Sequence, residues 1–363
     1  MKITYLGFKE LTERGRAVFS MGLTISLPVM IFLLINAYQT GLETQFSTLH
    51  NNFLLAQEAG SMGELYGSRL PAELRNELQR KGSSQVAAEL HTVTGTSPEN
   101  AVLLRGIELE NYAGIEEFQI IEGRQLQPGD LPRTAMVGIK LAEERNAYSN
   151  DRLEIRGRDF LVVGVFTNGT YADYEAWISI KDAQDLLGWG TDVSTFVIPA
   201  GENFKAGDSL PGGVAIVKKG ESGEDLVKEW RPFFNLFGVI AYTLGVAVAM
   251  ALASMLWRLA WLRRRELAIL QSIGFGKLSL FWYLFVQGLG ITTIGFALGI
   301  TEAMVVSRLI PLQATGISTD AVFDLFVILS SLGFAGLITL AGSGIPAYWF
   351  SRQNLVQLMK VEE

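Results

Sequence analysis

The sequence contains no cysteine, which excludes a disulfide framework, a zinc–thiolate site and thiol catalysis. Charged residues are also scarce, because they make up only 18% of the 363 residues, against about 25% in ordinary globular chains. Hydrophobic residues make up 49%, which excludes a disordered chain and argues against an ordinary water-soluble one. The 30 basic and 37 acidic residues give a net charge of −7, which weakly disfavours a nucleic-acid-binding protein.

Four stretches of the chain contain no charged residue at all. Even the shortest, with 22 residues, would be about 33 Å long as a helix and would cross a hydrocarbon core of about 30 Å. Buried helices of a soluble protein can also be apolar on every side, but the fourfold recurrence and the basic flanks favour transmembrane helices. Several glycines within them predict close helix packing. The stretches are Ala17–Tyr38, Pro232–Trp257, Leu278–Thr301 and Leu325–Ser351, and the glycines are Gly238, Gly245, Gly288, Gly290, Gly295, Gly299, Gly333 and Gly336.

The first apolar stretch also resembles a signal peptide, because it follows a segment, residues 1–16, that contains four basic residues. Its 22 charge-free residues exceed the apolar region of a cleaved signal, which has about 7–15 residues. No clear cleavage site follows. We therefore interpret residues 17–38 as an uncleaved first transmembrane helix.

Basic residues in the short flanking segments predict the orientation in the membrane. Residues 1–16 contain four Lys or Arg, residues 258–277 five and the tail 352–363 two, whereas residues 311–322 contain none. The positive-inside rule then places the basic segments in the cytoplasm. The segment 41–231, with 18 basic and 29 acidic residues and a net charge of 18 − 29 = −11, lies outside. We expect a multi-pass protein of the cell (inner) membrane, with both termini cytoplasmic.

The 191 residues of segment 41–231 are enough for a hydrophobic core and predict an extracytoplasmic α+β domain. A helix is expected over Leu65–Gly82, with Pro71 in its first turn and Gly82 at its end. Two further helices are expected over Lys140–Asn146 and Lys181–Leu187, and Gly157-Arg158 predicts a hairpin turn. Strands are expected at Val102–Leu104, Phe118–Ile121, Ala135–Ile139, Arg152–Ile155, Phe160–Phe166, Trp177–Ile180, Phe196–Ile198 and Val214–Val217.

A capping box at Ser222–Asp225 predicts the start of a helix that continues through Val227 and Trp230 into the second membrane span. Pro232 is expected to kink this helix, because proline lacks a backbone donor and clashes with the preceding turn. A helix shared by the domain and the membrane would pass rigid-body motion between them. A plain tether between the two parts is the alternative, and the sequence leaves both open.

The segment 258–277 predicts a short amphipathic helix between two spans. Leu259, Leu262, Ile269 and Ile273 share one helical face. Gly274 and Gly276 are expected to end the helix, because glycine adopts the left-handed conformation at little cost. Such a helix could present Glu266, Leu270 and Ile273 to a soluble partner. Alternatively, the three arginines at 263–265 only fix the topology and bind anionic lipid headgroups.

The run RRRELAILQSIGFGK, at Arg263–Lys277, closely resembles the segment after the second membrane helix of FtsX/MacB-type (type VII) ABC transporter permeases. The external segment resembles the periplasmic core domain of the same family, and the layout of one helix, a large domain and three helices also matches. The tail after Ser351 lacks the expected Pro and Ala-Leu-Arg. The external pieces that carry the resemblance are EGRQLQPGD at Glu122–Asp130, TAMVGIKLAEE at Thr134–Glu144, DRLEIRGRDFLVVGVF at Asp151–Phe166 and WISIKDAQDLLG at Trp177–Gly188.

The resemblance implies four transmembrane helices with a MacB-like domain inserted between the first two. It also implies a permease that dimerises with an identical or paralogous subunit and sits on a separate ABC ATP-binding subunit, which binds the ATP. Membrane lipid and an extracytoplasmic adaptor or lipoprotein are further expected partners, and residues 3–16 match the family's short N-terminal helix. The segment that couples to the ATPase maps to Arg263, Arg264, Arg265, Glu266, Leu267, Ile269, Leu270, Ile273 and Gly274.

We find no catalytic, cofactor-binding or metal-binding constellation in the sequence. His50 and His91 lack ligand-like spacing, and we expect both on the solvated surface. Asp173 and Glu175 suggest a loop that enters a strand rather than a carboxylate pair. Gly274-Phe-Gly276-Lys277 lacks the earlier glycine and the following Ser or Thr of a phosphate-binding loop. Four ionisable residues are expected at the membrane interface rather than along a pathway: Glu302, Arg308, Asp320 and Asp324.

The leading hypothesis is therefore a permease subunit that transmits the motion of a separate ATPase to its external domain, for export or extraction of a substrate. A regulator that transports nothing, and activates an external partner such as a cell-wall hydrolase, is the main alternative. A stand-alone membrane sensor is a third. A membrane-embedded enzyme ranks last, because paired catalytic residues are missing.

Overall fold

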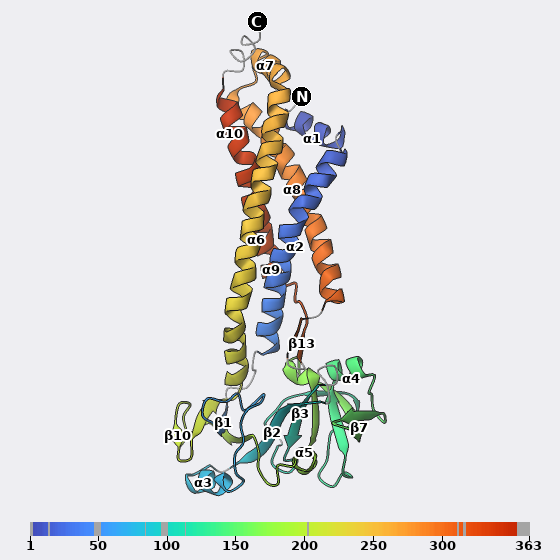
Figure 1. Ribbon diagram of the computed structural model, residues 1–363, viewed down its shortest axis with the longest axis vertical. Coiled ribbons are helices and arrows are strands. Elements are labelled where there is room, and N and C mark those ends of the chain that lie inside the picture. The colour runs from blue at the N-terminus through green and yellow to red at the C-terminus, as the bar shows by residue number, and fades with distance from the viewer. Residues whose placement is uncertain are drawn as a thin grey trace. The chain divides into compact units, whose positions relative to one another are not determined.

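The computed structural model describes residues 3–13, 15–46, 52–83, 85–95, 101–112, 114–201, 203–310, 312–314 and 317–353. The chain forms two compact units, which are both seen in Figure 1. The helical unit comprises Met1–Thr40, Arg231–Pro311 and Asp320–Glu363. The sheet unit comprises Gly41–Trp230 and Leu312–Thr319.

The helical unit is built from long apolar helices. Four are long and apolar enough to cross a membrane: Gly15–Gln45, Glu221–Leu262, Lys277–Leu309 and Leu325–Arg352. Each contains one of the charge-free stretches, so the helical interpretation of these stretches is confirmed. The helices are α1 (Ile3–Glu13), α2 (Gly15–Gln45), α6 (Glu221–Leu262), α7 (Arg264–Ser272), α8 (Lys277–Leu309), α9 (Leu325–Thr339), the π turn η3 (Leu340–Gly344) and α10 (Ile345–Arg352).

Glycines let α8 pack closely against α2. A Cβ atom on Gly295 would lie 2.7 Å from the side chain of Ile25, and one on Gly299 would lie 2.8 Å from Val29. Ile25 and Val29 are fully buried in the core of the helical unit. Small residues at helix crossings are the usual means of close packing in membranes. The packing role predicted for Gly238, Gly333 and Gly336 is wrong, because these three positions face open space.

The sheet unit contains a mixed sheet with the order β10-β11-β1-β9-β2-β3-β8-β5-β7-β4, and β6 pairs with β7. The β3–β8 and β5–β7 pairs are parallel and the other pairs are antiparallel. The strands are β1 (Phe53–Glu58), β2 (Ala87–Thr94), β3 (Val102–Ile107), β4 (Gln119–Gly123), β5 (Thr134–Gly138), β6 (Arg152–Ile155), β7 (Arg158–Thr167), β8 (Glu175–Ser179), β9 (Thr195–Pro199), β10 (Ser209–Leu210) and β11 (Val214–Lys218).

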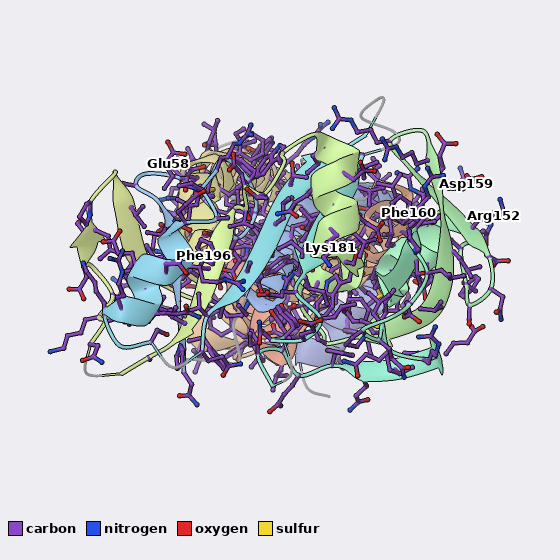
Figure 2. The ribbon with its side chains drawn as sticks, turned by 90° about the horizontal axis from the view of Figure 1, so that it is seen from below. Glu58, Arg152, Asp159, Phe160, Lys181 and Phe196 are labelled. Atoms are coloured by element: carbon purple, nitrogen blue, oxygen red, sulfur yellow. The ribbon has the colours of Figure 1, made fainter. Side chains whose placement is uncertain are left out.

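Short helices cover the sheet, and a separate hairpin, β12 (Leu312–Ala314) and β13 (Ile317–Thr319), belongs to the same unit. Figure 2 shows α5 (Ile180–Leu187), which contains Lys181, across one face of the sheet. Gly106 on β3 permits this contact, because a Cβ atom there would lie 2.5 Å from Ala183 of α5. The remaining elements are α3 (Leu74–Arg80), α4 (Ile139–Arg145) and the 3-10 turn η2 (Tyr171–Tyr174).

The α+β class and all eight strand runs expected from the sequence are confirmed. The predicted helix over Leu65–Gly82 is wrong for its first half, because α3 begins only at Leu74. Leu70 instead forms a β-bridge with Val193, since a residue before proline is disfavoured in the helical region. The expected stop at Gly82 is confirmed by its φ of 103°.

The hairpin turn at Gly157 is confirmed, because Ile155 pairs with Arg158 across it. The capping box predicted at Ser222 is not formed, since α6 already begins at Glu221 and Ser222 lies inside it. The carboxylate of Glu221 instead accepts a hydrogen bond from the backbone N–H of Lys218 at 2.9 Å. The predicted continuation of the helix past Pro232 is confirmed by the bounds of α6.

Arg105 is a fully buried cation in the core of the sheet unit. It donates to Glu175 on the neighbouring strand β8 at 3.0 Å and to Glu116 at 2.7 Å. Its guanidinium also donates to the hydroxyls of Tyr112 at 3.1 Å and Tyr171 at 3.2 Å. These partners satisfy the charge that β3 carries into the core.

Lys219 is a second buried cation, and Glu116 joins it to Arg105. The Lys219 ammonium donates to Glu116 at 2.7 Å and to Glu64 at 3.1 Å. Burial disfavours the charged form of Glu116, but Lys219 and Arg105 outweigh burial and lower its pKa to about 2. Against the same effect of burial, Lys219 and His91 lower the pKa of Glu89.

The first prediction concerns acid stability. Because the folded pKa of Glu116 is about 2 and its ordinary value is 4.5, its ionised form stabilises the fold above pH 4.5. This contribution is lost as pH falls from 4.5 towards 2. Glu116→Gln should lower the unfolding free energy at pH 7 by about 3 kcal/mol and weaken its acid dependence. Denaturant unfolding of the full-length protein in detergent, followed by circular dichroism, measures both.

Asp159→Asn is the control for that experiment, because this exposed carboxylate faces Arg152 at 3.6 Å on the surface. Exposed pairs contribute about 0–1 kcal/mol. Equal losses in the two variants would contradict the assignment of Glu116 to a buried ion pair.

The second prediction concerns the α2–α8 crossing. Gly295→Leu should destabilise the helical unit by at least about 2 kcal/mol, because its side chain would meet Ile25 and the backbone oxygen of Gly22. Gly333 faces open space, so the Gly333→Leu substitution should be tolerated. Thermal unfolding in detergent compares the two, and similar melting temperatures would refute close packing at Gly295.

Candidate coupling site

The predicted coupling segment is a separate short helix, α7, between two membrane-length helices. The backbone breaks at Arg263, with φ −101° and ψ 17°, so α6 ends at Leu262 and α7 begins at Arg264. The expectation of one helical face through Leu259, Leu262, Ile269 and Ile273 is therefore wrong, because Leu259 and Leu262 belong to α6.

Gly274 ends α7 in the left-handed conformation, with φ 103°, as the sequence predicted. The same role predicted for Gly276 is wrong, since its φ is −71° and it precedes α8 as the N-cap. Gly274, Phe275 and Gly276 thus form a tight connection between α7 and α8.

One face of α7 is fixed to the helical unit and the other is exposed. Leu267 and Ala268 are buried, in a cluster with Tyr283 and Phe350, and Leu270 packs partly against this cluster. Arg265 and Glu266 are exposed. Ile269 and Ile273 are also exposed, by 54% and 71%. Of the predicted coupling residues, Leu267 therefore faces inward, whereas Ile269 and Ile273 present apolar surface outward.

Arg263 joins this helix to the N-terminal helix. It forms an ion pair with Glu10 of α1, and Glu10 also accepts from the Tyr283 hydroxyl at 2.6 Å and from Gln287 Nε2 at 3.1 Å. Burial lowers the pKa of Arg263, but the charge of Glu10 outweighs it and raises the pKa. The Glu10 carboxylate thereby ties α1 to the start of α7 and to α8.

Glu10 was not among the coupling residues predicted from the sequence. Residues 1–16 contain two acidic residues, Glu10 and Glu13, among four basic ones, and these two were the signal that could have directed attention to Glu10. The guanidinium of Arg264 lies 5.0 Å from the ring centre of Trp261 at the end of α6.

The other ionisable residues singled out from the sequence lie apart from this site. His91 is buried on β2, contrary to the surface location expected, and its Nε2 lies 2.7 Å from Glu89 Oε2. His50 lies outside the described residues. Glu175 is the first residue of β8, which confirms a loop that enters a strand. Glu302, inside α8, accepts a hydrogen bond from Ser26 of α2 at 2.9 Å.

Within the described ranges, no group of three or more His, Asp or Glu side chains is arranged to hold a metal ion. The sheet unit does contain an open groove of about 850 Å³. Glu116, Glu117 and Asn168 provide polar groups to it, and Phe118 and Ile120 provide apolar surface. Its location beside Glu116 places it next to the buried ion pairs of Arg105 and Lys219.

Comparisons with protein families give matches along nearly the whole chain. Residues 17–230 match the MacB-like periplasmic core domain, and residues 236–355 match the FtsX-like permease C-terminal. No curated protein matches the chain.

Solved structures that are similar to part of the chain include two extracytoplasmic regions. The extracellular domain of the noncanonic ABC-type transporter YknZ from Gram-positive bacteria is 19% identical, with a TM-score of 0.33, and the match covers 42% of this chain and 84% of that one. The periplasmic region of MacB from Actinobacillus actinomycetemcomitans is 12% identical, with a TM-score of 0.35, and the match covers 49% and 92%.

The family matches extend over both units, and they fall in the order that the helices and the sheet require. A domain of the MacB type lies between the first and second membrane-length helices, and the remaining helices carry the FtsX-like match. The chain therefore belongs to the FtsX/MacB-type permeases of ABC transporters, as a multi-pass membrane protein with a periplasmic-type α+β domain.

Proposed function

We propose that this permease transmits the ATP-driven motion of a separate ATP-binding subunit to its external domain, and that this motion exports or extracts a substrate. The observation that carries the proposal is that one face of α7 packs against the helical unit and the opposite face is exposed. Leu267 and Ala268 are buried against the helical unit, whereas Ile269 and Ile273 are exposed. A partner that binds the exposed face can displace α7 only together with the helices to which it is packed.

Glu10 extends this displacement from α7 to neighbouring helices. Its carboxylate holds Arg263, Tyr283 and Gln287 at once, so α1, the start of α7 and α8 share one set of bonds. Hydrogen bonds to a charged group contribute about 1.5–3 kcal/mol each. Force applied to α7 is therefore delivered to α1 and α8 rather than lost in a flexible loop.

The orientation follows from the basic segments, with α1 and α7 in the cytoplasm and the sheet unit outside. ATP binds to the separate subunit, and a second permease subunit, identical or paralogous, completes the assembly. In this chain, Gly274, Phe275 and Gly276 serve as the connection from α7 to α8, which begins at Lys277.

A second candidate function uses the same assembly without transport. The groove beside Glu116 offers an external partner both polar and apolar surface, and in this second function that partner is an extracytoplasmic enzyme, such as a cell-wall hydrolase, which the motion activates. ATP-dependent release of lipid or lipoprotein from reconstituted vesicles separates the two functions. Release supports transport, and its absence together with activation of a co-purified enzyme supports regulation.

The third prediction tests the exposed face of α7. Ile269→Glu combined with Ile273→Glu should reduce co-purification of the ATP-binding subunit at least about tenfold, because two unpaired carboxylates would have to be removed from water in the interface. Leu309→Glu, at the C-terminal end of α8, is the control, since Leu309 is 73% exposed. Undiminished recovery of the ATPase with the double variant would remove α7 as the docking helix.

The fourth prediction separates docking from transmission. Glu10→Gln leaves the exposed face of α7 intact but weakens the bonds to Arg263, Tyr283 and Gln287. The ATPase should still bind, while substrate release per ATP hydrolysed falls about fivefold. Glu13→Gln changes an exposed carboxylate on the same helix and should have no effect. If both variants kept the original ratio, Glu10 would have no part in transmission.

A further inference from the structure

The sheet unit contains the ends of the helices that connect it to the helical unit. Gly41–Gln45 at the C-terminal end of α2 and Glu221–Trp230 at the N-terminal end of α6 both belong to it. The β12–β13 hairpin, between α8 and α9 in the chain, belongs to it as well. Whatever holds these ends determines how motion of a helix reaches the sheet.

Phe46 lies between the two helix ends. It is 2% exposed and stacks on Tyr171, with ring centres 5.2 Å apart and an angle of 16° between the rings. A Cβ atom on Gly223, in the first turn of α6, would lie 2.8 Å from the Phe46 ring. Next to it, Gln45 donates to the backbone oxygen of Ser318 in β13 at 3.1 Å. The end of α2 thus contacts η2, α6 and the hairpin.

A series of polar contacts leads from Tyr171 to the start of α6. The Tyr171 hydroxyl accepts from Arg105, Arg105 donates to Glu116, and Glu116 accepts from Lys219. Lys219 then donates to Glu64 at 3.1 Å.

Glu64 is the last group in this series of polar contacts and binds the backbone directly before α6. It accepts from the backbone N–H of Gly220 at 2.7 Å, directly before the first residue of α6. Its side chain is 2% exposed. Every group between Phe46 and Gly220 therefore has a defined partner in the core of the sheet unit.

The energetics of these contacts argue against a role in stability alone. Removing an ion from water costs several kcal/mol even in real proteins, and replacing a buried ion pair by apolar residues of similar volume is often neutral or stabilising. Apolar packing is not directional, whereas hydrogen-bonded charges fix one arrangement. Arg105, Glu116 and Lys219 thus provide geometry that an apolar core would not provide.

We propose that Phe46, Tyr171 and the ionic groups Arg105, Glu116, Lys219 and Glu64 form a clamp that holds the ends of α2 and α6 in one fixed arrangement on the sheet. They act as positioning residues, and none of them is assigned a contact with substrate. The sheet and the two helix ends then move as one body. The use of this clamp in transmission rests on the proposed function, but the fixed arrangement itself does not.

The test measures how firmly α6 is held. Asp159→Cys on β7 (Figure 2) and Glu229→Cys on α6 introduce two exposed label sites into a chain that has no cysteine. Spin labels on the full-length protein in lipid nanodiscs report the distribution of distances between them by pulsed electron paramagnetic resonance. The unmodified clamp should give a single narrow distribution.

Two variants open the clamp at opposite ends. Phe46→Leu removes the stacking on Tyr171, and Glu64→Leu removes the bonds to Lys219 and Gly220. Each should cause loss of the narrow distribution. Tyr171→Phe keeps the stacked ring and removes only the hydroxyl, and it should broaden the distribution as well, so the proposal stays testable if either larger change prevents folding.

Matched controls change equivalent side chains in the same unit that touch neither helix end. Phe118→Leu removes a ring that contacts Phe166 and Trp177. Glu108→Leu removes a carboxylate that accepts from Arg75 and from the backbone N–H of Ala88. Both should keep the narrow distribution even where the melting temperature falls. Equal broadening in controls and clamp variants, or a narrow distribution in all of them, overturns the clamp.

A second measurement keeps this inference apart from the proposed function. The same labelled chain, assembled with its ATP-binding subunit, is used to measure substrate release per ATP hydrolysed. A narrow distribution in the unmodified protein that is lost in the clamp variants supports the clamp whether or not release occurs. Absence of ATP-dependent release in the unmodified assembly counts against the proposed function only.

Discussion

Glu116 bridges two buried cations, and the arrangement of the sheet unit depends on this single carboxylate. It accepts from Arg105 on β3 and from Lys219 just before α6. Either cation alone in the core would be costly, since an uncompensated buried charge destabilises a fold by several kcal/mol. The single carboxylate of Glu116 therefore compensates two buried charges, that of Arg105 on a strand in the middle of the sheet and that of Lys219 just before a membrane-length helix.

Glu10 has a comparable place in the helical unit. It collects Arg263, Tyr283 and Gln287 and so joins three helices at one point. In both units a carboxylate with several donors lies where elements from distant parts of the chain meet. Although only 18% of the residues are charged, some of these charges lie where helices and strands from different parts of the sequence contact one another. Apolar packing fills the remaining space, and the glycines of α8 set the distance between helices.

The membrane-length helices, the inserted α+β domain and its eight recognised strands were predictable, because long charge-free runs and β-branched alternation are local signals. The clamp was not, since Lys219 and its partner Glu64 are 155 positions apart and no local pattern links them. β2 was missed for a related reason. Glu89 and His91 interrupt its apolar pattern, and the two side chains are buried against each other, with the charge of Lys219 from another part of the chain also acting on Glu89. At the coupling segment, the exposure of Ile273 was foreseen, whereas Leu270 was expected outward and instead packs partly against a buried cluster. The break at Arg263 was not predicted, and Arg263 forms its ion pair with Glu10, which is 253 positions away.

The π turn at Leu340–Gly344 determines how α10 meets α7. Before the turn, Val327, Phe334 and Ile338 face the core. A π turn adds one residue to the regular repeat, which rotates everything after it by about 100° around the helix axis. Ala347 and Phe350 are thereby placed inward, in the cluster that receives Leu267, and Trp349 is turned outward. The one extra residue of the π turn thus sets which side chains of α10 face α7 and line the apolar surface against which α7 packs.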